Sequence, residues 1–511
     1  MISRTSSAAV LAATTVLAGA AGARADVTAE QVWSDWRGYM ADAGYTVRAT
    51  EERSGDVLTV TDLTMTFEVP EEDSTVTMTM GEMTFTDNGD GTVALGLPAD
   101  LPIGVVVEGP EGEEADVGLN YATTGLSINV SGDPDDMTYT YSAAMVGLSL
   151  DRLAVEGETV DMAEFGTAEL SLANVAGSTR MVIGELRRSI QKVSSGAITY
   201  LVDINEPEGG DGHVVVRGGA DSMDLKADVS LPEDMDTEEM SRMLAAGFAI
   251  DGSFSIEGGN TSFDFTDDEE AVQGSSSSAM SGLRVVMNKE RVLYSGDAEA
   301  LEISMAGGDL PFPVEIGAED TGFTMDMPVA RSEEMQDFAL AMRLGGVSVS
   351  EMIWGMIDPG GQLPHDPATV AFDISGTAKL FVDLFDPDQM AKIDTGESLP
   401  GELNSLQLND LTVSAAGAEL TGAGAFTFDN SDLETFEGMP APSGEVNLKL
   451  VGGNGLLDKL VGMGLVPEEE ASGMRMMMGL FAVPGEGEDT LTSTIEVRDD
   501  GQILANGQRL Q

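Results

Sequence analysis

Hydrophobic and polar residues alternate one by one along much of this chain. The stretch DLTMTFEV puts the apolar residues of 63–69 on one side of a strand and Asp, Thr and Glu on the other. The same pattern recurs in MDLKADVSL (223–231), GFTMDMPV, GEVNLKLV and LTSTIEV. A period of two with one polar face is typical of antiparallel sheets. We therefore predict a mainly β protein built from elongated, curved antiparallel sheet with one apolar face, part of it covered by helices.

One hairpin shows a strand that changes face. The apolar positions of residues 76–80 are in one phase and those of residues 83–85 in the other, so we predict a β-bulge at 81–82. The sequence DNGDG (87–91) then predicts a tight reversal. A calcium loop is the alternative there, but the EF-hand spacing would place Pro98 where a bidentate glutamate is required.

Helical patterns are few. Thr28 to Gln31 form a capping box, and the following helix of about four turns should dock its tryptophans on a sheet. Further helices are expected from Asp236, from Ser332, and at Glu351–Ile357 after Ser350, followed by a long strand from Phe372 to Leu384. A helical hairpin is expected near the end of the chain, with Pro467 opening its second arm.

The first 25 residues have the features of a secretory signal peptide. A positive charge at Arg4 precedes a short apolar segment, and Ala23-Arg24-Ala25 fits a cleavage site. No later segment reaches the ~18 apolar residues that a membrane-spanning helix needs. We therefore expect an exported protein located in the periplasm, with secretion as the second choice. Residues 26–266 and 283–511 are expected to form two β-rich regions, joined by a linker at 267–282.

The charge of the chain is extreme. It has 89 acidic and 25 basic residues, a net charge of −64, and no cysteine. Such a surface excludes nucleic acid as a partner, because that binding depends on basic residues. The absence of cysteine excludes thiol nucleophiles and disulfides. The carboxylates are explained by a solvated surface, with calcium binding as the alternative.

Candidate catalytic groups are sparse. The two histidines, His213 and His365, have no neighbours that would make a metal site or a catalytic pair, and no nucleophile elbow, HExxH or P-loop occurs. We predict no enzyme, no catalytic residue, no metal site and no cofactor.

Methionine is unusually frequent, with 30 residues against 17 phenylalanines. Methionine fills cores, but it is also over-used where a surface must accept varied apolar partners. If the sheet's apolar face is only partly covered, the candidate ligand-binding residues are those near the tryptophan of residues 351–357 and in the last helix: Trp354, Met356, Met474, Met477, Met478 and Phe481.

The segments IWGMIDPGGQLPHDPATVAFDISGTAKLFVDLFD, FDNSDLETFEGMPAPSGEVNLKLVGGNGLLDKLVGMGLVPEEEASGMRMMMGLFA and GEDTLTSTIEVRDDGQILANGQRL resemble the family called domain of unknown function 2125. The resemblance extends over most of the mature chain and is most specific over 350–510. It implies export and brings no catalytic residue. A long one-sided sheet with a late helical element is also similar in architecture to the AsmA-type envelope proteins, whose elongated β-grooves are associated with lipid traffic.

Three functions follow from these patterns. The first is a non-enzymatic periplasmic protein that binds a lipid or another apolar ligand in a β-sheet groove for envelope maintenance. The second is a structural or protein-interaction module with a closed core, whose partners would be envelope proteins. The third is a calcium-binding exported protein.

Overall fold

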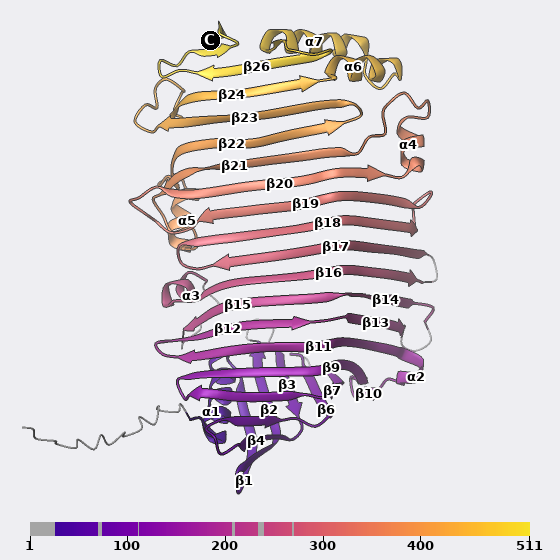
Figure 1. Ribbon diagram of the computed structural model, residues 1–511, viewed down its shortest axis with the longest axis vertical. Helices are drawn as coiled ribbons and strands as arrows, with labels where there is room; N and C mark the ends of the chain where they lie inside the picture. Colours follow the sequence, from indigo (N-terminus) through magenta and orange to yellow (C-terminus); the bar gives the residue numbers. More distant parts are fainter. Residues whose placement is uncertain are drawn as a thin grey trace, which may run out of the picture.

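The computed structural model describes residues 26–69, 74–110, 112–206, 210–232, 240–267 and 270–510. The predicted signal peptide lies outside these residues. The described strands form one long antiparallel sheet, with helices at its two ends and along its margins (Figure 1). The predicted fold class is therefore confirmed.

The helices are short. Thr28 caps the first through the predicted capping box, in which its side chain and that of Gln31 each accept the other residue's backbone N–H. The helix after Ser350 and the C-terminal hairpin are also confirmed. The described helices are α1 (Ala29–Asp42), α2 (Met162–Phe165), α3 (Met240–Ala246), α4 (Glu351–Ile357), α5 (Pro387–Asp394), α6 (Gly453–Gly462) and α7 (Glu468–Phe481).

The N-terminal strands curl around α1 and enclose the main hydrophobic core. Trp33, which is 2% exposed, packs against Phe85 with ring centroids 5.9 Å apart. These strands are β1 (Thr46–Ser54), β2 (Val57–Val69), β3 (Ser74–Met80), β4 (Met83–Asp87), β5 (Val93–Gly96), β6 (Asp100–Glu108), β7 (Glu114–Thr124), β8 (Ser127–Asp133), β9 (Asp136–Val155) and β10 (Glu158–Thr159).

Beyond β9 the sheet extends as a single layer. From β16 to β24 each strand pairs with the next one along the chain. The strands are β11 (Gly166–Ile183), β12 (Leu186–Ser195), β13 (Ile198–Asn205), β14 (His213–Ala220), β15 (Ser222–Pro232), β16 (Ala249–Thr266), β17 (Ala271–Met287), β18 (Arg291–Gly307), β19 (Val314–Pro328), β20 (Gln336–Val349), β21 (Ala368–Leu380), β22 (Gly401–Ala415), β23 (Ala418–Asp429), β24 (Ala441–Val451), β25 (Val483–Pro484), β26 (Thr490–Val497), β27 (Ile503–Ala505) and β28 (Gln508–Arg509).

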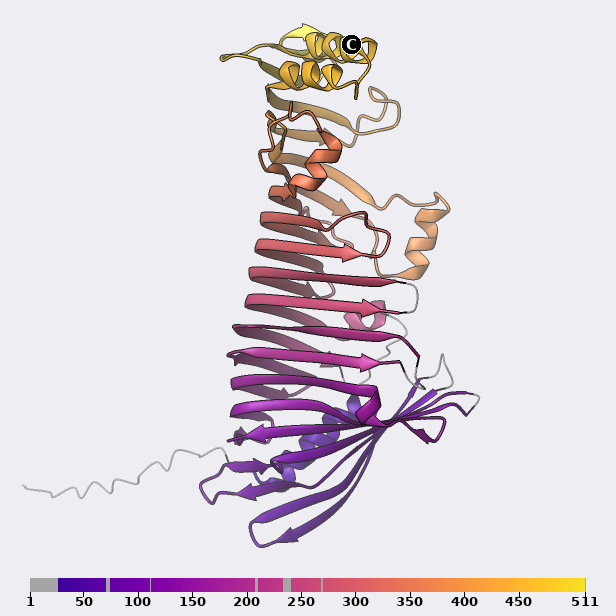
Figure 2. The same cartoon turned by 90° about the vertical axis from the view of Figure 1, so that its right-hand side faces the viewer.

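A crease crosses the strands near their midpoints. Asn174, Gly258, Ala300 and Gly346 have positive φ values of 51°, 62°, 49° and 59°, and the ladder pairing is interrupted at or beside each of them. The register is the same on both sides of Ala300, so the crease continues straight from strand to strand. Figure 2 shows the resulting curvature of the sheet.

The crease also moves the apolar residues to the alternate positions. In β16 the apolar residues are Phe254 and Ile256 before Gly258, but Phe263 and Phe265 after it. The change of phase predicted at 81–82 is present, but the β-bulge predicted there is wrong: β3 ends and β4 begins on either side of those two residues, and β2 pairs with both strands in one register. Without this change, each strand would put half of its apolar residues on the wrong face.

Two local predictions are wrong. The helix expected from Ser332 is strand β20, since Phe338, Leu340 and Met342 repeat with a period of two that outweighs the helix-like start. In the linker expected at 267–282, residues 271–282 belong to β17, which pairs on both sides. Its run of serines is typical of a flexible linker, but in the structure these residues belong to a paired strand.

Two other predictions need smaller changes. The strand expected from Phe372 to Leu384 is β21, which begins at Ala368 and ends at Leu380. The helix expected from Asp236 is α3, described from Met240 onward, while residues 233–239 lie outside the described part.

Candidate apolar binding face

One face of the sheet carries its apolar side chains, and we call it the inner face. The strand pairing places its residues in rows that cross the sheet. One such row, from β16 to β20, consists of Phe254, Leu283, Gly296, Phe323 and Met342. Beyond the crease, Ile303 faces Ile316, which faces Val349. The opposite side of the same strands is the outer face.

The inner face is uncovered along the middle of the sheet. Among the described residues, its large side chains between β11 and β22 include many that are 37–47% exposed, an unusual state for apolar groups in contiguous rows. These are Leu170, Phe254, Phe265, Leu283, Ile303, Met305, Ile316, Phe323, Met327, Leu340, Leu344, Val370 and Val413.

Aromatic side chains on the inner face lie over glycines of the neighbouring strand. A Cβ on Gly296 would be 2.6 Å from the ring of Phe323, and one on Gly274 would be 2.4 Å from the ring of Phe263. Gly376 stands in the same relation to Phe338. Glycine is therefore required where a ring covers the neighbouring backbone, which explains part of the high glycine content.

The inner face is almost free of charge. In the inner rows of the described strands from β11 to β26 there is no carboxylate, although the chain has 89 acidic residues. The one charged residue in these rows is Arg187 of β12, which is paired with Asp35 of α1. A carboxylate surface that served solubility alone would not require so complete a separation of charge from one face.

The outer face carries ion pairs between neighbouring strands. Arg188 binds Asp228 at 2.5 Å, and Arg180 binds Asp136 at 2.6 Å. These guanidinium groups lower the pKa values of both carboxyls through hydrogen bonds and charge. Arg284–Asp251, Arg291–Asp326 and Arg343–Asp320 repeat the arrangement along the sheet. Such exposed pairs contribute little stability each, but they mark this face as the wet one.

Helix α1 closes the inner face at the N-terminal end. Asp35 accepts hydrogen bonds from Arg187 at 2.5 Å and from the hydroxyl of Tyr139 at 3.0 Å. Burial and the nearby carboxylate raise the pKa of Tyr139 well above its usual value. The helix is thus fixed to β9 and β12 by a polar contact inside an otherwise apolar interface.

Helix α7 closes the other end. Met477, Met478 and Phe481 lie over Leu448 and Leu491 of β24 and β26 around an apolar hollow of about 400 Å³. The structure therefore brings together half of the predicted ligand-binding residues, on the predicted face. Met474 and Met476 lie on the same helix but do not line this hollow, and Met476 is 73% exposed.

The other two predicted residues lie elsewhere. Trp354 on α4 stacks on His365 with ring centroids 4.3 Å apart and planes 6° apart, so its ring has a protein partner. Met356 on the same helix is 62% exposed. Helix α4 stands at the margin of the sheet between β20 and β21, separate from α7 (Figure 1). The sequence did not indicate the large exposed residues of β16–β20, which only the pairing register brings into one face.

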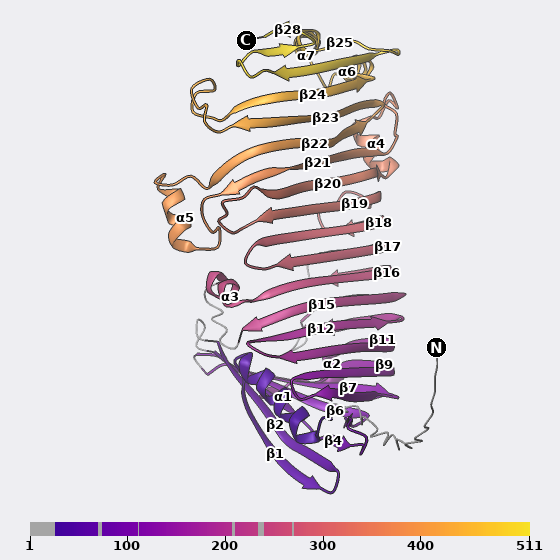
Figure 3. The same cartoon turned by 60° about the vertical axis from the view of Figure 1, so that its left-hand side comes forward.

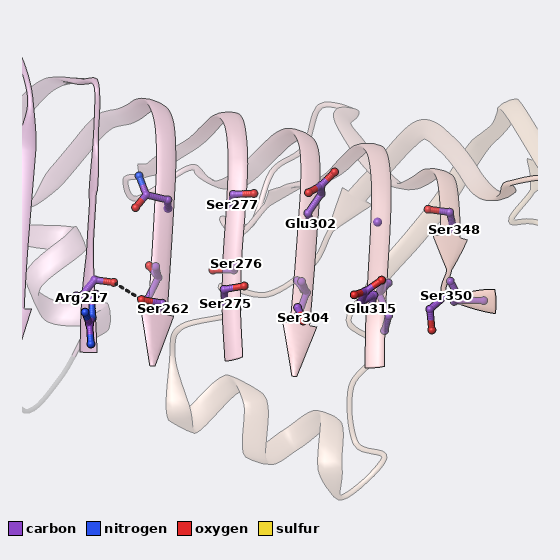
Figure 4. Close-up of a pocket in the computed structure, with 16 residues that line it drawn as sticks. Arg217, Ser262, Ser275, Ser276, Ser277, Glu302, Ser304, Glu315, Ser348 and Ser350 are labelled. Atoms are coloured by element: carbon purple, nitrogen blue, oxygen red, sulfur yellow. Dashed lines mark hydrogen bonds between the residues drawn. The ribbon is translucent and has the colours of Figure 1, made fainter. Parts of the chain in front are cut away.

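A polar hollow of about 720 Å³ lies over the half of the sheet beyond the crease (Figure 4). Ser262, Ser275, Ser304 and Glu315 face one another in succession across β16–β19. The serines among its lining residues are small and leave the space open. No histidine is among its described lining residues, and Ser262 donates a hydrogen bond to the carbonyl of Arg217.

The remaining candidates for chemistry have structural partners. His213 contacts Asp203 at 2.9 Å on neighbouring strands. Asp87 of the DNGDG turn accepts the backbone N–H of Ala29 and binds Arg53. In the part of the chain that the structure describes, no three His, Cys, Asp or Glu side chains cluster as a metal site would require. Its helices include none long and apolar enough to cross a bilayer.

These features define an elongated single-sheet β protein with an uncovered apolar face closed by helices at both ends. The chain belongs to the bacterial family described as uncharacterized protein conserved in bacteria (DUF2125), whose family model matches residues 241–508. The match begins in α3, so the N-terminal core lies outside it. Comparison with curated proteins and with solved structures found no match.

Proposed function

We propose that this protein binds lipids or other apolar molecules on its inner face and serves maintenance of the bacterial envelope from the periplasm. The observation that carries this proposal is the uncovered apolar face between α1 and α7. Exposing apolar area to water is unfavourable, by about 25 cal/mol per Å², so a contiguous apolar face favours an occupant. The signal-like first residues support the periplasmic location.

The dimensions favour long or multiple apolar chains. From β11 to β22, at about 4.8 Å per strand spacing, the face extends for roughly 40 Å. A bilayer's hydrocarbon core is about 30 Å thick and contains two layers of chains. The face is therefore longer than one acyl chain, and it has room for several side by side along the sheet.

The lack of charge on the inner face also fits an apolar occupant. A carboxylate among these rows would have to be desolvated when a chain covered it, at a high cost in free energy. The outer face keeps the carboxylates and arginines in water instead. A polar headgroup would accordingly lie at a margin of the face rather than along its middle.

Native mass spectrometry of the protein purified without detergent from its own periplasm tests the proposal. We expect additional mass that is released on denaturation and identified as lipid by extraction. A chain that carries no lipid and takes up none from added phospholipid would contradict the proposal. The protein-interaction function would then be preferred, with an envelope protein covering the face.

A matched pair of variants links uptake to the inner face. Leu340→Asp places a charge in the inner row of β20, and Ala341→Asp places the same charge one residue away on the outer face. We expect the first to lose lipid and the second to keep it, with circular dichroism confirming that both fold. Equal lipid content in the two variants would show that binding occurs elsewhere.

A further inference from the structure

The two ends of the inner face are closed in different ways (Figure 3). At the N-terminal end, α1 packs into the main core, where Trp33 is 2% and Phe85 is 0% exposed. At the other end, α7 lies over β24 and β26 but leaves the apolar hollow of about 400 Å³. Met477 and Phe481, which line that hollow, are still 53% and 36% exposed. The protein's own side chains therefore fill the first end, whereas the second has space for an occupant.

An exposed row of the inner face leads into this hollow. From β20 to β26 the row consists of Leu344, Val370, Val413, Leu420, Leu450 and Leu491. Its first three members are 38–42% exposed, and its last three line the hollow. An apolar chain lying along this row passes from the open face to the space beneath α7 over leucine and valine side chains alone.

The hollow offers little to a polar group. Among the described residues that line it, the polar side chains are those of Thr492 and Ser493. Thr492 is paired with Lys449 in a row of the outer face, and the hydroxyl of Ser493 donates to the carbonyl oxygen of Phe481 at 2.6 Å. A headgroup placed here would lose its hydrogen bonds to water without replacement, at a cost in free energy. The hollow therefore fits hydrocarbon and excludes a headgroup.

Helix α7 combines fixed ends with an adaptable surface. The carbonyl oxygen of Phe481 also accepts a hydrogen bond from the side chain of Asn506 at 2.9 Å, and Arg475 binds Asp458 of α6 at 2.5 Å. Between these contacts the helix presents Met477 and Met478 to the hollow. Methionine is flexible and polarizable, so it adapts to apolar groups of different shape. The helix can thus cover different chains without leaving the sheet.

We propose that the hollow beneath α7 binds the methyl end of an acyl chain, with the headgroup of the same amphiphile directed away from α7. The inference rests on the proposed function and adds a binding site and an orientation to it. An apolar cavity of about 150 Å³ accepts a benzene molecule. By proportion, the hollow of about 400 Å³ accommodates on the order of ten carbon atoms, which is part of a chain rather than a whole lipid.

The length of a chain then places the headgroup. One layer of chains takes up half of a bilayer's hydrocarbon core, roughly 15 Å. At about 4.8 Å per strand this is about three strand spacings. A chain that ends beneath α7 at β26 therefore has its ester group near β22.

Photocrosslinking of the unaltered chain, without its predicted signal peptide, tests the orientation. The probes are two palmitoyl lysophosphatidylcholines, one with a diazirine at the methyl end and one with a diazirine next to the ester, used below micelle-forming concentrations. We expect the first to label peptides of α7, β24 and β26, and the second to label β21–β22. The reverse pattern, or the same pattern for both probes, would overturn the inference while leaving the proposed function intact.

A matched pair of variants tests the site itself. Met478→Trp enlarges a side chain that lines the hollow, and Met476→Trp makes the same change on the same helix outside it. We expect Met478→Trp to weaken palmitoyl lysophosphatidylcholine about tenfold, because excluding about two methylene groups costs roughly a factor of four for each. Met476→Trp should bind as the wild type does, with circular dichroism confirming that both variants fold.

The outcomes separate the inference from the proposed function. Wild-type affinity in Met478→Trp, or equal losses in the two variants, would show that the chain end does not occupy the hollow. Failure of the wild type to bind either lysophosphatidylcholine would instead contradict the proposed function itself.

Discussion

Arg187 on β12 and Asp35 on α1 form an ion pair of 2.5 Å in which the two side chains are 12% and 3% exposed. Removing one member of a buried pair leaves the other charge without its partner. We expect Arg187→Ala to lower the free energy of unfolding of the N-terminal core by about 3 kcal/mol. Urea unfolding followed by tryptophan fluorescence measures this, because Trp33 and Trp36 both pack in that core.

The control for this ion pair is Arg180→Ala, which breaks an exposed pair with Asp136. That change should cost much less free energy of unfolding than Arg187→Ala, because an exposed pair is screened by solvent. Equal losses in the two variants would mean that the contact between α1 and the sheet does not depend on the buried pair.

Tyr139 gives the N-terminal core a sensitivity to alkaline pH. Its folded-state pKa is raised above the unfolded value near 10, so the stability it contributes is complete below pH 10 and is lost as the pH rises toward the folded pKa. We expect the thermal midpoint of the wild type to fall more steeply above pH 10 than that of Tyr139→Phe. A control variant, Tyr294→Phe on the open sheet, should keep the slope of the wild type. Parallel curves for the wild type and Tyr139→Phe would contradict the prediction.

Ala300 adopts the left-handed conformation at the crease, with φ of 49°. A residue with a Cβ pays roughly 1–2 kcal/mol there, and glycine does not. Ala300→Gly should therefore stabilise the sheet by about 1 kcal/mol, visible as a higher thermal midpoint in calorimetry. Ala298→Gly, two residues earlier in the regular part of β18, should destabilise it by roughly 0.5–1 kcal/mol. If both substitutions raise the thermal midpoint, or both lower it, the left-handed conformation of Ala300 does not carry the expected cost in free energy.

Gly296 lies beneath the ring of Phe323. Gly296→Ala would force the ring aside, and we expect a loss of roughly 1–3 kcal/mol, as is typical of overpacked sites. Gly322→Ala is the control, because a Cβ there would have its nearest neighbour, the carbonyl oxygen of Gly296, at 3.5 Å. Chemical denaturation measures the free energy of unfolding of the two variants, and Gly296→Ala should show the larger loss. Similar stabilities would show that the ring accommodates a methyl group without loss.

Strict alternation was sufficient to predict the class of fold and the single apolar face, and capping residues and helical periodicity predicted most helices. It failed where two signals competed: at Ser332, charged residues before an apolar run imitated a helix start, and at 271–282 a run of serines imitated a linker. In both places the partners on neighbouring strands decided the structure. Such pairing is not visible in a local window of sequence.

Only part of the candidate site could be predicted, because the rest of it also depends on the pairing between strands. The methionine cluster of α7 is local, so Met477, Met478 and Phe481 could be found by composition. Trp354 was chosen for its rarity, and it proved to have a ring partner in His365. The rows formed by Phe254, Leu283 and Phe323 depend on the pairing of neighbouring strands, and the crease changes which residues of a strand point to the inner face.

From β16 to β24 each strand pairs with the next one along the chain, so the number of strands can change without altering the rest of the fold. Two consecutive strands could be added or removed without changing the direction or the partners of the others, as in repeat proteins whose units contact only their neighbours. Evolution or design could thus lengthen or shorten the inner face while the helices at both ends stay the same. The area of the inner face would then grow with the number of strands, and no existing contact would have to be redesigned.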